Sequence, residues 1–169
     1  MMPIRRRTML ALPGAVLPAA AGAQDFPGRG ITIVVPYAAG GGADITARLM
    51  APRMQAGLGQ PVVIENRTGA NGVLGAEVVA RAAPDGYTLG MVVSSHVINK
   101  AVLPNLPFDP VTDFTPVMLV ARTQLVLVAT PTLGATTVKE MIEKIRAKPG
   151  EYAYASPGAG SNVHVFLEW

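Results

Sequence analysis

The segment ITIVVPYAAGGGADITARL, from Ile31 to Leu49, places the strongest constraint on the fold. Its first five residues are mostly β-branched, which is typical of a strand that is buried on both faces. Pro36 has no N–H and ends the strand, and three consecutive glycines from Gly40 allow a tight turn. Ile45 and Leu49 then follow at helical spacing. The segment predicts a strand, a glycine-rich loop and a helix, in that order.

A loop that leads from the carboxyl end of a strand into a helix is where open α/β sheets bind ligands. Its free N–H groups and the helix dipole favour an anion such as a carboxylate or a phosphate. The nucleotide motifs do not fit, because Ile45 stands at the last position of G-x-G-x-x-G counted from Gly40, and no Gly-Lys-Ser/Thr follows. Asp44 would repel a phosphate. We expect it to cap the helix, a role compatible with orienting a binding loop.

Residues 1–23 have the composition of an export signal. Arg5 to Arg7 precede a short apolar segment, and Ala21-Gly22-Ala23 fits the small-x-small cleavage pattern. The apolar segment is too short and too broken by proline to span a membrane. We therefore expect a mature chain that starts at Gln24 and is exported to the periplasm by the Sec or the twin-arginine route.

The charge and cysteine content exclude several classes of function. The chain has 14 basic and 11 acidic residues, and three of the basic ones lie in the signal, which leaves 11 of each. No basic stripe therefore suggests a nucleic-acid partner. With no cysteine and two histidines, we expect no disulfide, no metal site and no cofactor. The remaining 146 residues (169 − 23) are enough for one ordinary domain.

Strands and helices alternate along the rest of the chain, which predicts a parallel α/β sheet. Pro52 is expected to kink or restart the first helix. The expected strands cover residues 62–64, 87–93, 117–121, 125–129 and 152–155. The expected helices cover 73–79, 97–103 and 138–145, the last one capped by Thr136 or Thr137. A proline-rich connection covers 104–116. The loop 156–164 then repeats the opening arrangement, so two glycine-rich loops could face each other across a cleft.

Nucleophilic catalysis has weak support in this sequence. Ser94, Ser95 and His96 follow a predicted strand, but no G-x-S-x-G occurs anywhere in the chain. An exported α/β hydrolase that uses Ser95 or Ser161 with a histidine is therefore the alternative hypothesis. Taken alone, the loop 156–164 could also be a plain tight turn.

Four motifs together carry a family resemblance. PYAAGGGADITAR, GQPVVIENRTGANGVLGAEVVARAAPDGYTLGM, LPFDPVTDFTPV and YASPGAGSNVH occur in this order, from about Pro27 to His164. They resemble the Bug/TctC family, the extracytoplasmic solute-binding proteins of tripartite tricarboxylate transporters. The resemblance implies a non-enzymatic, periplasmic-binding-protein-like α/β fold with two hinged lobes. It also implies a small carboxylate ligand and the membrane subunits of a transporter as partners.

The resemblance implies a ligand site built from amides, hydroxyls and waters of two opposed loops. This agrees with the chemistry, because a carboxylate needs N–H and O–H donors and not necessarily an arginine. The expected ligand-binding residues are Tyr37, Ala38, Ala39, Gly40, Gly41, Gly42, Asp44, Ser94, Ser95, His96, Ser156, Gly158, Ala159, Gly160, Ser161, Asn162 and His164.

Members of the family are considerably longer than this chain. The resemblance places a first lobe at 24–120 and the start of a second lobe at 121–169, and the ending VFLEW departs from the family pattern. We therefore expect a truncated copy that binds its ligand weakly or not at all, with a non-functional remnant as the other alternative.

Overall fold

A parallel three-stranded sheet lies at the centre of the computed structural model, which describes residues 26–156, 158 and 160–168. The strands are β1 (Ile31–Val35), β2 (Val62–Asn66) and β3 (Thr88–Gly90), in the order β2-β1-β3. Ile33 of β1 lies opposite Ile64 on one side and Leu89 on the other. The predicted parallel α/β sheet and its first two strands are confirmed.

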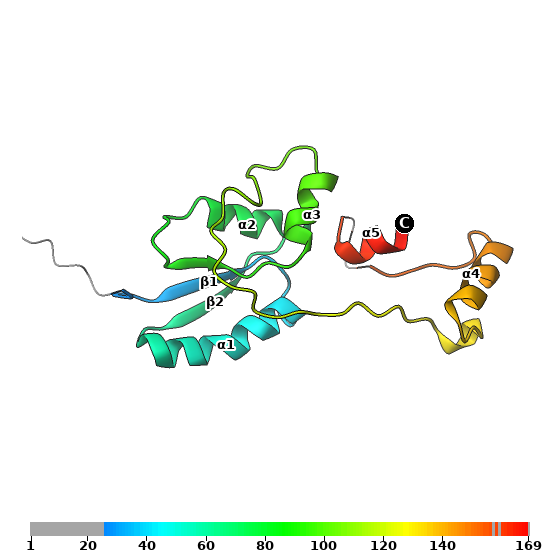
Figure 1. Ribbon diagram of the computed structural model, residues 1–169, viewed down its shortest axis with the longest axis horizontal. Coiled ribbons are helices and arrows are strands. Elements are labelled where there is room, and N and C mark those ends of the chain that lie inside the picture. The colour runs from blue at the N-terminus through cyan, green and yellow to red at the C-terminus, as the bar shows by residue number, and fades with distance from the viewer. Residues whose placement is uncertain (1–25, 157, 159, 169) are drawn as a thin grey trace, which may run out of the picture.

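Two helices cover opposite faces of this sheet (Figure 1). They are α1 (Gly42–Leu58) and α2 (Val73–Ala80), and α2 follows a short 3₁₀ turn, η1 (Ala70–Gly72). The other helices are α3 (Ser95–Val102), α4 (Val138–Ala147) and α5 (Asn162–Glu168), with a second 3₁₀ turn, η2 (Pro131–Leu133). Parallel neighbours joined through helices on both faces form the doubly wound arrangement, which directs ligands to the carboxyl ends of the strands.

Helix α1 packs on the sheet through small side chains. Ile33 and Val35 form a buried cluster with Ala47, and Ala51 is also buried. The alanines allow the helix to approach the strands closely. The spacing of Ile45 and Leu49 predicted this helix, but neither residue lies on its buried face, because they are 51% and 72% exposed.

Pro52 lies inside α1, which runs without a break from Gly42 to Leu58. The expected restart of the helix is therefore wrong. Pro52 is exposed, so water can reach the carbonyl of Arg48, which lacks its usual intrahelical donor. Gly59 ends the helix in the left-handed conformation, with φ of 68°.

A second core lies on the other side of the sheet. Val73 and Ala76 of α2 pack against Phe108 of the proline-rich connection, and Leu103 and Phe114 close the cluster. Residues 104–116 form no helix or strand, as predicted. This connection therefore covers α2 and α3 with an apolar surface while remaining irregular.

The remaining sequence-based boundaries need correction. The third strand is shorter than expected, and α3 begins at Ser95 rather than at Val97, because the Ser94 carbonyl accepts the first helical hydrogen bond from Ile98. The strands expected over 117–121, 125–129 and 152–155 are not formed. Branched side chains favour an extended backbone, but a strand also needs a neighbour, and none pairs with these residues in the described part of the chain.

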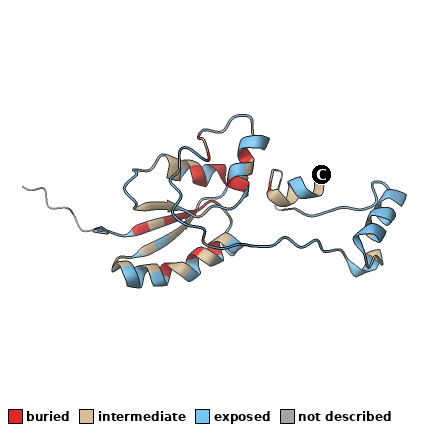
Figure 2. Ribbon diagram, in the orientation of Figure 1, coloured by how far each residue is buried: buried red, intermediate tan, exposed pale blue. Residues whose placement is uncertain are grey.

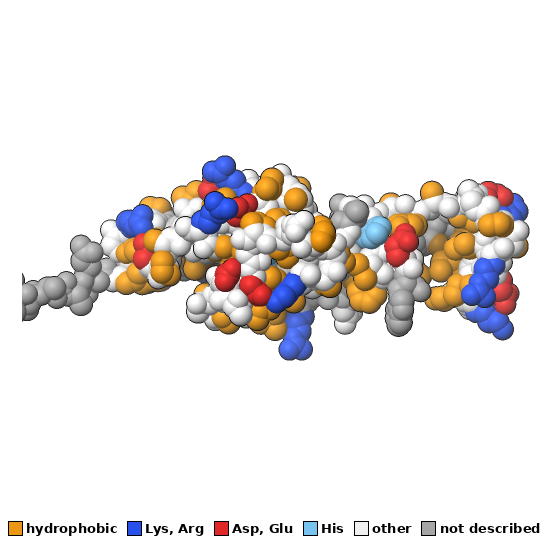
Figure 3. Space-filling model, turned by 90° about the horizontal axis from the view of Figure 1, so that it is seen from above, with side chains coloured by type: hydrophobic (Ala, Val, Ile, Leu, Met, Phe, Trp, Pro, Cys, Tyr) orange, Lys and Arg blue, Asp and Glu red, His pale blue; other side chains and the backbone are white. Residues whose placement is uncertain are grey.

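Residues 117–155 lead away from the sheet to α4 and return to α5 beside α3 (Figure 1). Thr137 caps α4 as predicted, since its hydroxyl accepts from the Glu140 amide at 3.2 Å. Buried residues lie in the sheet and the helices and loops around it, in the proline-rich connection at Phe108 and Pro110, and at Ser161 before α5, and α4 is exposed along most of its surface (Figure 2). Apolar side chains lie at the surface around α4 (Figure 3), among them Val138 and Ile142. Among the described residues, no helix combines the length and apolar character needed to cross a bilayer.

Candidate functional site at the carboxyl edge of the sheet

Three strand-to-helix loops meet at the carboxyl edge of the sheet. β1 leads through residues 36–41 into α1, β2 ends at Asn66 and leads into η1 and α2, and β3 leads through 91–94 into α3. Gly160 and Ser161 of the second glycine-rich loop return to this edge and lead into α5 (Figure 1). The structure therefore brings this part of the second loop to the same edge of the sheet as the first loop.

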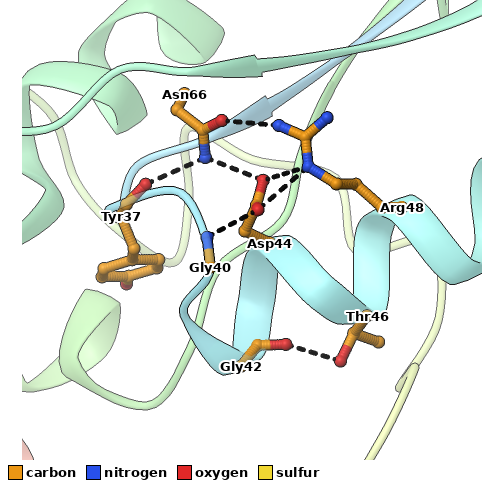
Figure 4. Close-up of polar contacts among 7 residues, drawn as sticks. All are labelled: Tyr37, Gly40, Gly42, Asp44, Thr46, Arg48 and Asn66. Carbon is orange, nitrogen blue, oxygen red and sulfur yellow. Dashed lines mark hydrogen bonds and ion pairs between the residues drawn. The ribbon is translucent and has the colours of Figure 1, made fainter.

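The first loop is fastened by the carboxylate of Asp44 (Figure 4). Asp44 is 2% exposed. Its Oδ2 accepts from the Gly40 amide at 2.8 Å and from Arg48 Nε at 2.9 Å, and its Oδ1 accepts from Asn66 Nδ2 at 2.9 Å. Asn66 Nδ2 also donates to the Tyr37 carbonyl at 3.1 Å. Asp44 thus ties the loop to β2 and to its own helix.

This arrangement corrects two expectations about Asp44. It is not the cap of α1, because the N-cap position is Gly41 and Asp44 accepts from the Gly40 amide outside the helix. Both of its oxygens are also occupied within the protein, which leaves no role in direct contact with a ligand. Asp44 instead holds the loop in place, a role that the sequence allowed alongside capping.

The loop retains some unpaired donors. The amide of Gly40 donates to Asp44, and the amide of Gly41 donates to the Ala38 carbonyl at 3.1 Å. In the part of the chain that the structure describes, the amides of Gly42, Ala43 and Asp44 have no partner, and the first helical hydrogen bond runs from Ile45 to the Gly41 carbonyl. These three N–H groups belong to the first turn of α1, where the helix dipole favours an anion.

Tyr37 and Ser95 form a polar pair next to this loop. The Tyr37 hydroxyl lies 3.2 Å from Ser95 Oγ and accepts from the Val93 amide at 3.3 Å. Ser95 is 2% exposed. The pair therefore joins the end of β1 to the start of α3 and fixes the position of the tyrosine ring.

The second loop is organised by its own polar side chains. Ser161 Oγ accepts from the His164 amide at 3.1 Å and so caps α5, and Ser156 Oγ accepts from the Gly158 amide at 3.4 Å. Asn162 Nδ2 donates to Ser94 Oγ at 3.2 Å, which joins this loop to the start of α3. Ala159, also expected at the site, lies outside the described residues.

His96 lies away from the loops. Its ring is 6% exposed, stacks on Phe108 and meets Phe114 edge-on, and its Nε2 lies 3.1 Å from the Pro110 carbonyl. Desolvation lowers the pKa of His96, although the hydrogen bond to Pro110 acts in the opposite direction. The expected ligand contact of His96 therefore conflicts with its position in the second core.

The structure offers no support for serine hydrolysis. Among the described residues, neither Ser95 nor Ser161 is hydrogen-bonded to an imidazole. The His164 ring lies 3.9 Å from the Glu168 carboxylate on the same helix. A serine nucleophile would need an adjacent general base.

Comparison with known proteins identifies the family. The model of the tripartite tricarboxylate transporter family receptor, TctC, matches residues 46–169. The chain belongs to the TctC family. TctC proteins are binding proteins and not enzymes. BugT of Bordetella pertussis is 39% identical over 148 residues, which are 86% of this chain and 45% of BugT. The chain spans about half the length of the curated TctC relatives that it matches.

Solved structures agree with this assignment. A periplasmic transporter superposes with a TM-score of 0.73 at 41% identity, over 85% of this chain and 48% of that protein. Rpa4515 of R. palustris, solved with adipate, gives 0.75 at 40% identity over 81% and 46% of the two chains. MatC (Rpa3494) from Rhodopseudomonas palustris, solved with bound malate, gives 0.64 at 39% identity over 72% and 42%. The α/β fold of this TctC chain therefore matches periplasmic binding proteins over about half their length.

Three asparagines of this TctC chain were not predicted from the sequence. Asn66 fixes the Tyr37 carbonyl, and Asn71 and Asn99 hydrogen-bond to each other. Asn66 is the last residue of β2, so its position at a strand end was a sequence signal of the site. Asn71 stands between Gly69 and Gly72, where the glycines indicate a turn. Asn99 lies in the middle of α3 and carried no signal.

The ionised carboxylate of Asp44 makes the stability of this chain against unfolding depend on pH at low pH. The hydrogen bond from Arg48, then those from Gly40 and Asn66, lower the pKa of Asp44 to about 2. Its ordinary value is about 3.9. Because the folded state lowers this pKa, the stabilisation is present above about pH 4 and is lost as the pH falls toward 2. Hydrogen bonds from Lys100 and two amides also lower the pKa of Asp109.

We therefore expect the stability of the wild type to fall between about pH 4 and pH 2. Asp44→Asn should be less stable at neutral pH and should lose less stability across this window. Urea unfolding at a series of pH values checks this, with Glu143→Gln, at an exposed position on α4, as the comparison variant. Parallel pH profiles for wild type and Asp44→Asn would show that Asp44 does not carry the effect.

Proposed function

We propose that this chain is a periplasmic solute-binding protein that captures a small dicarboxylate for a tripartite tricarboxylate-type transporter. Two relatives with solved structures carry adipate and malate, both of them dicarboxylates. In this proposal residues 24–120 form the first lobe and 121–169 the start of the second. The ligand partner is the dicarboxylate, and the protein partners are the membrane subunits of the transporter.

The free amides at the first turn of α1 are the observation that carries this proposal. Gly42 and Ala43 present two N–H groups at the positive end of a 17-residue helix. A carboxylate oxygen is a suitable acceptor for such donors. Asp44 stands next to them, but its charge is compensated by Arg48 and by the amides of Gly40 and Asn66. The nearby negative charge therefore repels an incoming carboxylate less than the sequence suggests.

The second loop supplies the opposing donors in this proposal. Asn162 and Ser94 place an amide and a hydroxyl beside α3, and α5 begins at the same point. The structure has two hollows away from the two loops. One lies beside α1 and the edge strand β2, and the other is lined by residues from Lys100 to Pro110. Because neither hollow lies between the loops, a ligand held between them is a proposal.

The location in the periplasm is also proposed for this chain. The similar solved structures include a periplasmic transporter and the periplasmic binding protein BugD. The expected export signal, residues 1–23, lies outside the described residues.

A titration of the isotope-labelled chain, followed by amide resonances, tests the function. We expect saturable shifts with adipate and with malate, at dissociation constants of about 1 mM, equivalent to about −4 kcal/mol. Weak binding is expected because only two groups of donors would hold the ligand, one at the carboxyl edge of the sheet and one in the loop that returns to it. Adipamide is the matched control, since it has the same length without the charges. Equal responses to adipate and adipamide, or no response to either dicarboxylate, would refute the proposal.

A further inference from the structure

The turn that precedes α2 has an unusual backbone. Four consecutive residues have positive φ, namely Gly69 (138°), Ala70 (47°), Asn71 (53°) and Gly72 (89°). Glycine adopts such angles without steric cost, and asparagine tolerates the left-handed region better than most residues. Alanine does not, so the turn stores strain that its surroundings must compensate.

The compensation comes from a reciprocal pair of asparagines. Asn71 Nδ2 donates to Asn99 Oδ1 at 2.7 Å, and Asn99 Nδ2 donates to the Asn71 carbonyl at 3.1 Å. Asn99 is 1% exposed and lies on α3. A buried side-chain amide that lost this partner would be left unsatisfied, so the pair fixes the left-handed turn against α3.

The same side chain also holds the second loop. Asn71 Nδ2 donates to the Gly160 carbonyl at 2.9 Å, across 89 positions in the sequence. Both N–H bonds of the Asn71 amide are therefore used, one toward α3 and one toward the loop. The contact is close, because a Cβ at Gly160 would lie 3.3 Å from Val102 and 3.6 Å from Asn71 Nδ2.

We infer that Asn71, held by Asn99, is a positioning residue for the segment from Gly160 to Asn162. It does not contact the ligand in this inference, but it sets the place from which Ser161 and Asn162 start α5. Together with the contact between Asn162 and Ser94, it fastens the returning segment to α3. The consequence for ligand affinity rests on the proposed function, whereas the fastening itself does not.

Hydrogen exchange on the full chain, without ligand, tests the fastening. Asn71→Gly keeps the left-handed turn but removes the side chain, and Asn71→Asp keeps the shape but removes the donor. In both variants the amides of His164 and Val165 should exchange about tenfold faster than in the wild type. The unfolding temperature should fall in both variants, because each leaves the buried Asn99 Oδ1 without its donor, but exchange in β1 should speed up less than exchange in α5. A residue with a merely structural role would speed up exchange in β1 and α5 equally.

Asn105→Asp is the matched control, because Asn105 is exposed and lies outside this cluster. It should leave exchange in α5 at the wild-type rate. Two results would overturn the inference. In Asn71→Gly, the α5 amides would exchange at the wild-type rate, or exchange in β1 and in α5 would speed up by the same factor.

A second readout separates this inference from the proposed function. If the wild type binds adipate, both Asn71 variants should bind it about tenfold more weakly. Faster exchange with unchanged adipate affinity would overturn the role of Asn71 in ligand binding. If the wild type binds no dicarboxylate, the proposed function fails, and the exchange rates still decide whether Asn71 holds the loop.

Discussion

Gly75→Ala is expected to destabilise the protein by about 2 to 3 kcal/mol. A Cβ at this position in α2 would lie 2.5 Å from the Arg67 carbonyl oxygen and 2.8 Å from Pro36 Cα. Both are backbone atoms, so no side-chain rotation can relieve the contact. The helix would have to move away from the end of β1, where the first glycine-rich loop begins. Urea unfolding measures the loss, and adipate binding should weaken with it.

Gly57→Ala is the matched control for this substitution. Gly57 lies in the last turn of α1, where a Cβ would meet nothing within 4 Å. Alanine is favoured over glycine in helices, so this variant should be more stable than the wild type by about 0.5 to 1 kcal/mol. The two substitutions add the same methyl group, and opposite signs identify close packing as the cause. Gly75→Ala with wild-type stability would show that α2 does not pack this closely on Pro36.

Phe108→Ala is expected to cost about 3 kcal/mol. The ring is 8% exposed and packs against Val73 and Ala76 of α2. It also stacks on His96 at 5.8 Å and meets Phe114 edge-on at 5.4 Å. Its removal would leave a cavity under the proline-rich connection, where the Val111 and Thr112 amides donate to Asp109 but no strand or helix forms. Thermal and urea unfolding should agree on the loss.

Phe166→Ala is the control, because this side chain is 65% exposed on α5 and should change stability by less than about 0.5 kcal/mol.

The pKa of His96 provides a second test of the effect of Phe108→Ala. Since desolvation is the main cause of its lowered pKa, Phe108→Ala should raise it toward the ordinary value. A stable variant with an unchanged His96 pKa would contradict the description of this core.

The sequence predicted the elements whose signals are local. The β-branched run before Pro36 predicted both ends of β1 correctly, and Thr137 predicted where α4 begins. The spacing of Ile45 and Leu49 indicated α1 but not its buried face, because the packing of α1 is set by the close approach that Ala47 permits. Residues 117–129 are apolar enough for strands, but a strand depends on a partner, and partners are not visible in a local pattern.

The candidate site was predictable in its place but not in its contacts. The rule that ligands bind at the carboxyl ends of parallel strands located the first glycine-rich loop. It did not locate the second, because the strand expected over 152–155 is not formed. The bonds that organise them join residues far apart in the chain, such as Asn66 with Tyr37 and Asn71 with Gly160. His96 was expected at the site because residues 94–96 follow a predicted strand and match a family position in the cleft. Instead its ring packs on Phe108 and Phe114 in the second core.

The position of bound adipate tests the central claim most directly. In the titration of the labelled chain, the largest amide shifts should fall on Gly42 and Ala43 and on the loop from Gly160 to His164. Both groups should saturate at the same ligand concentration, because one dicarboxylate would engage both loops. Shifts confined to the hollow beside α1 and β2, around Gln55 and Gln60, would contradict the claim.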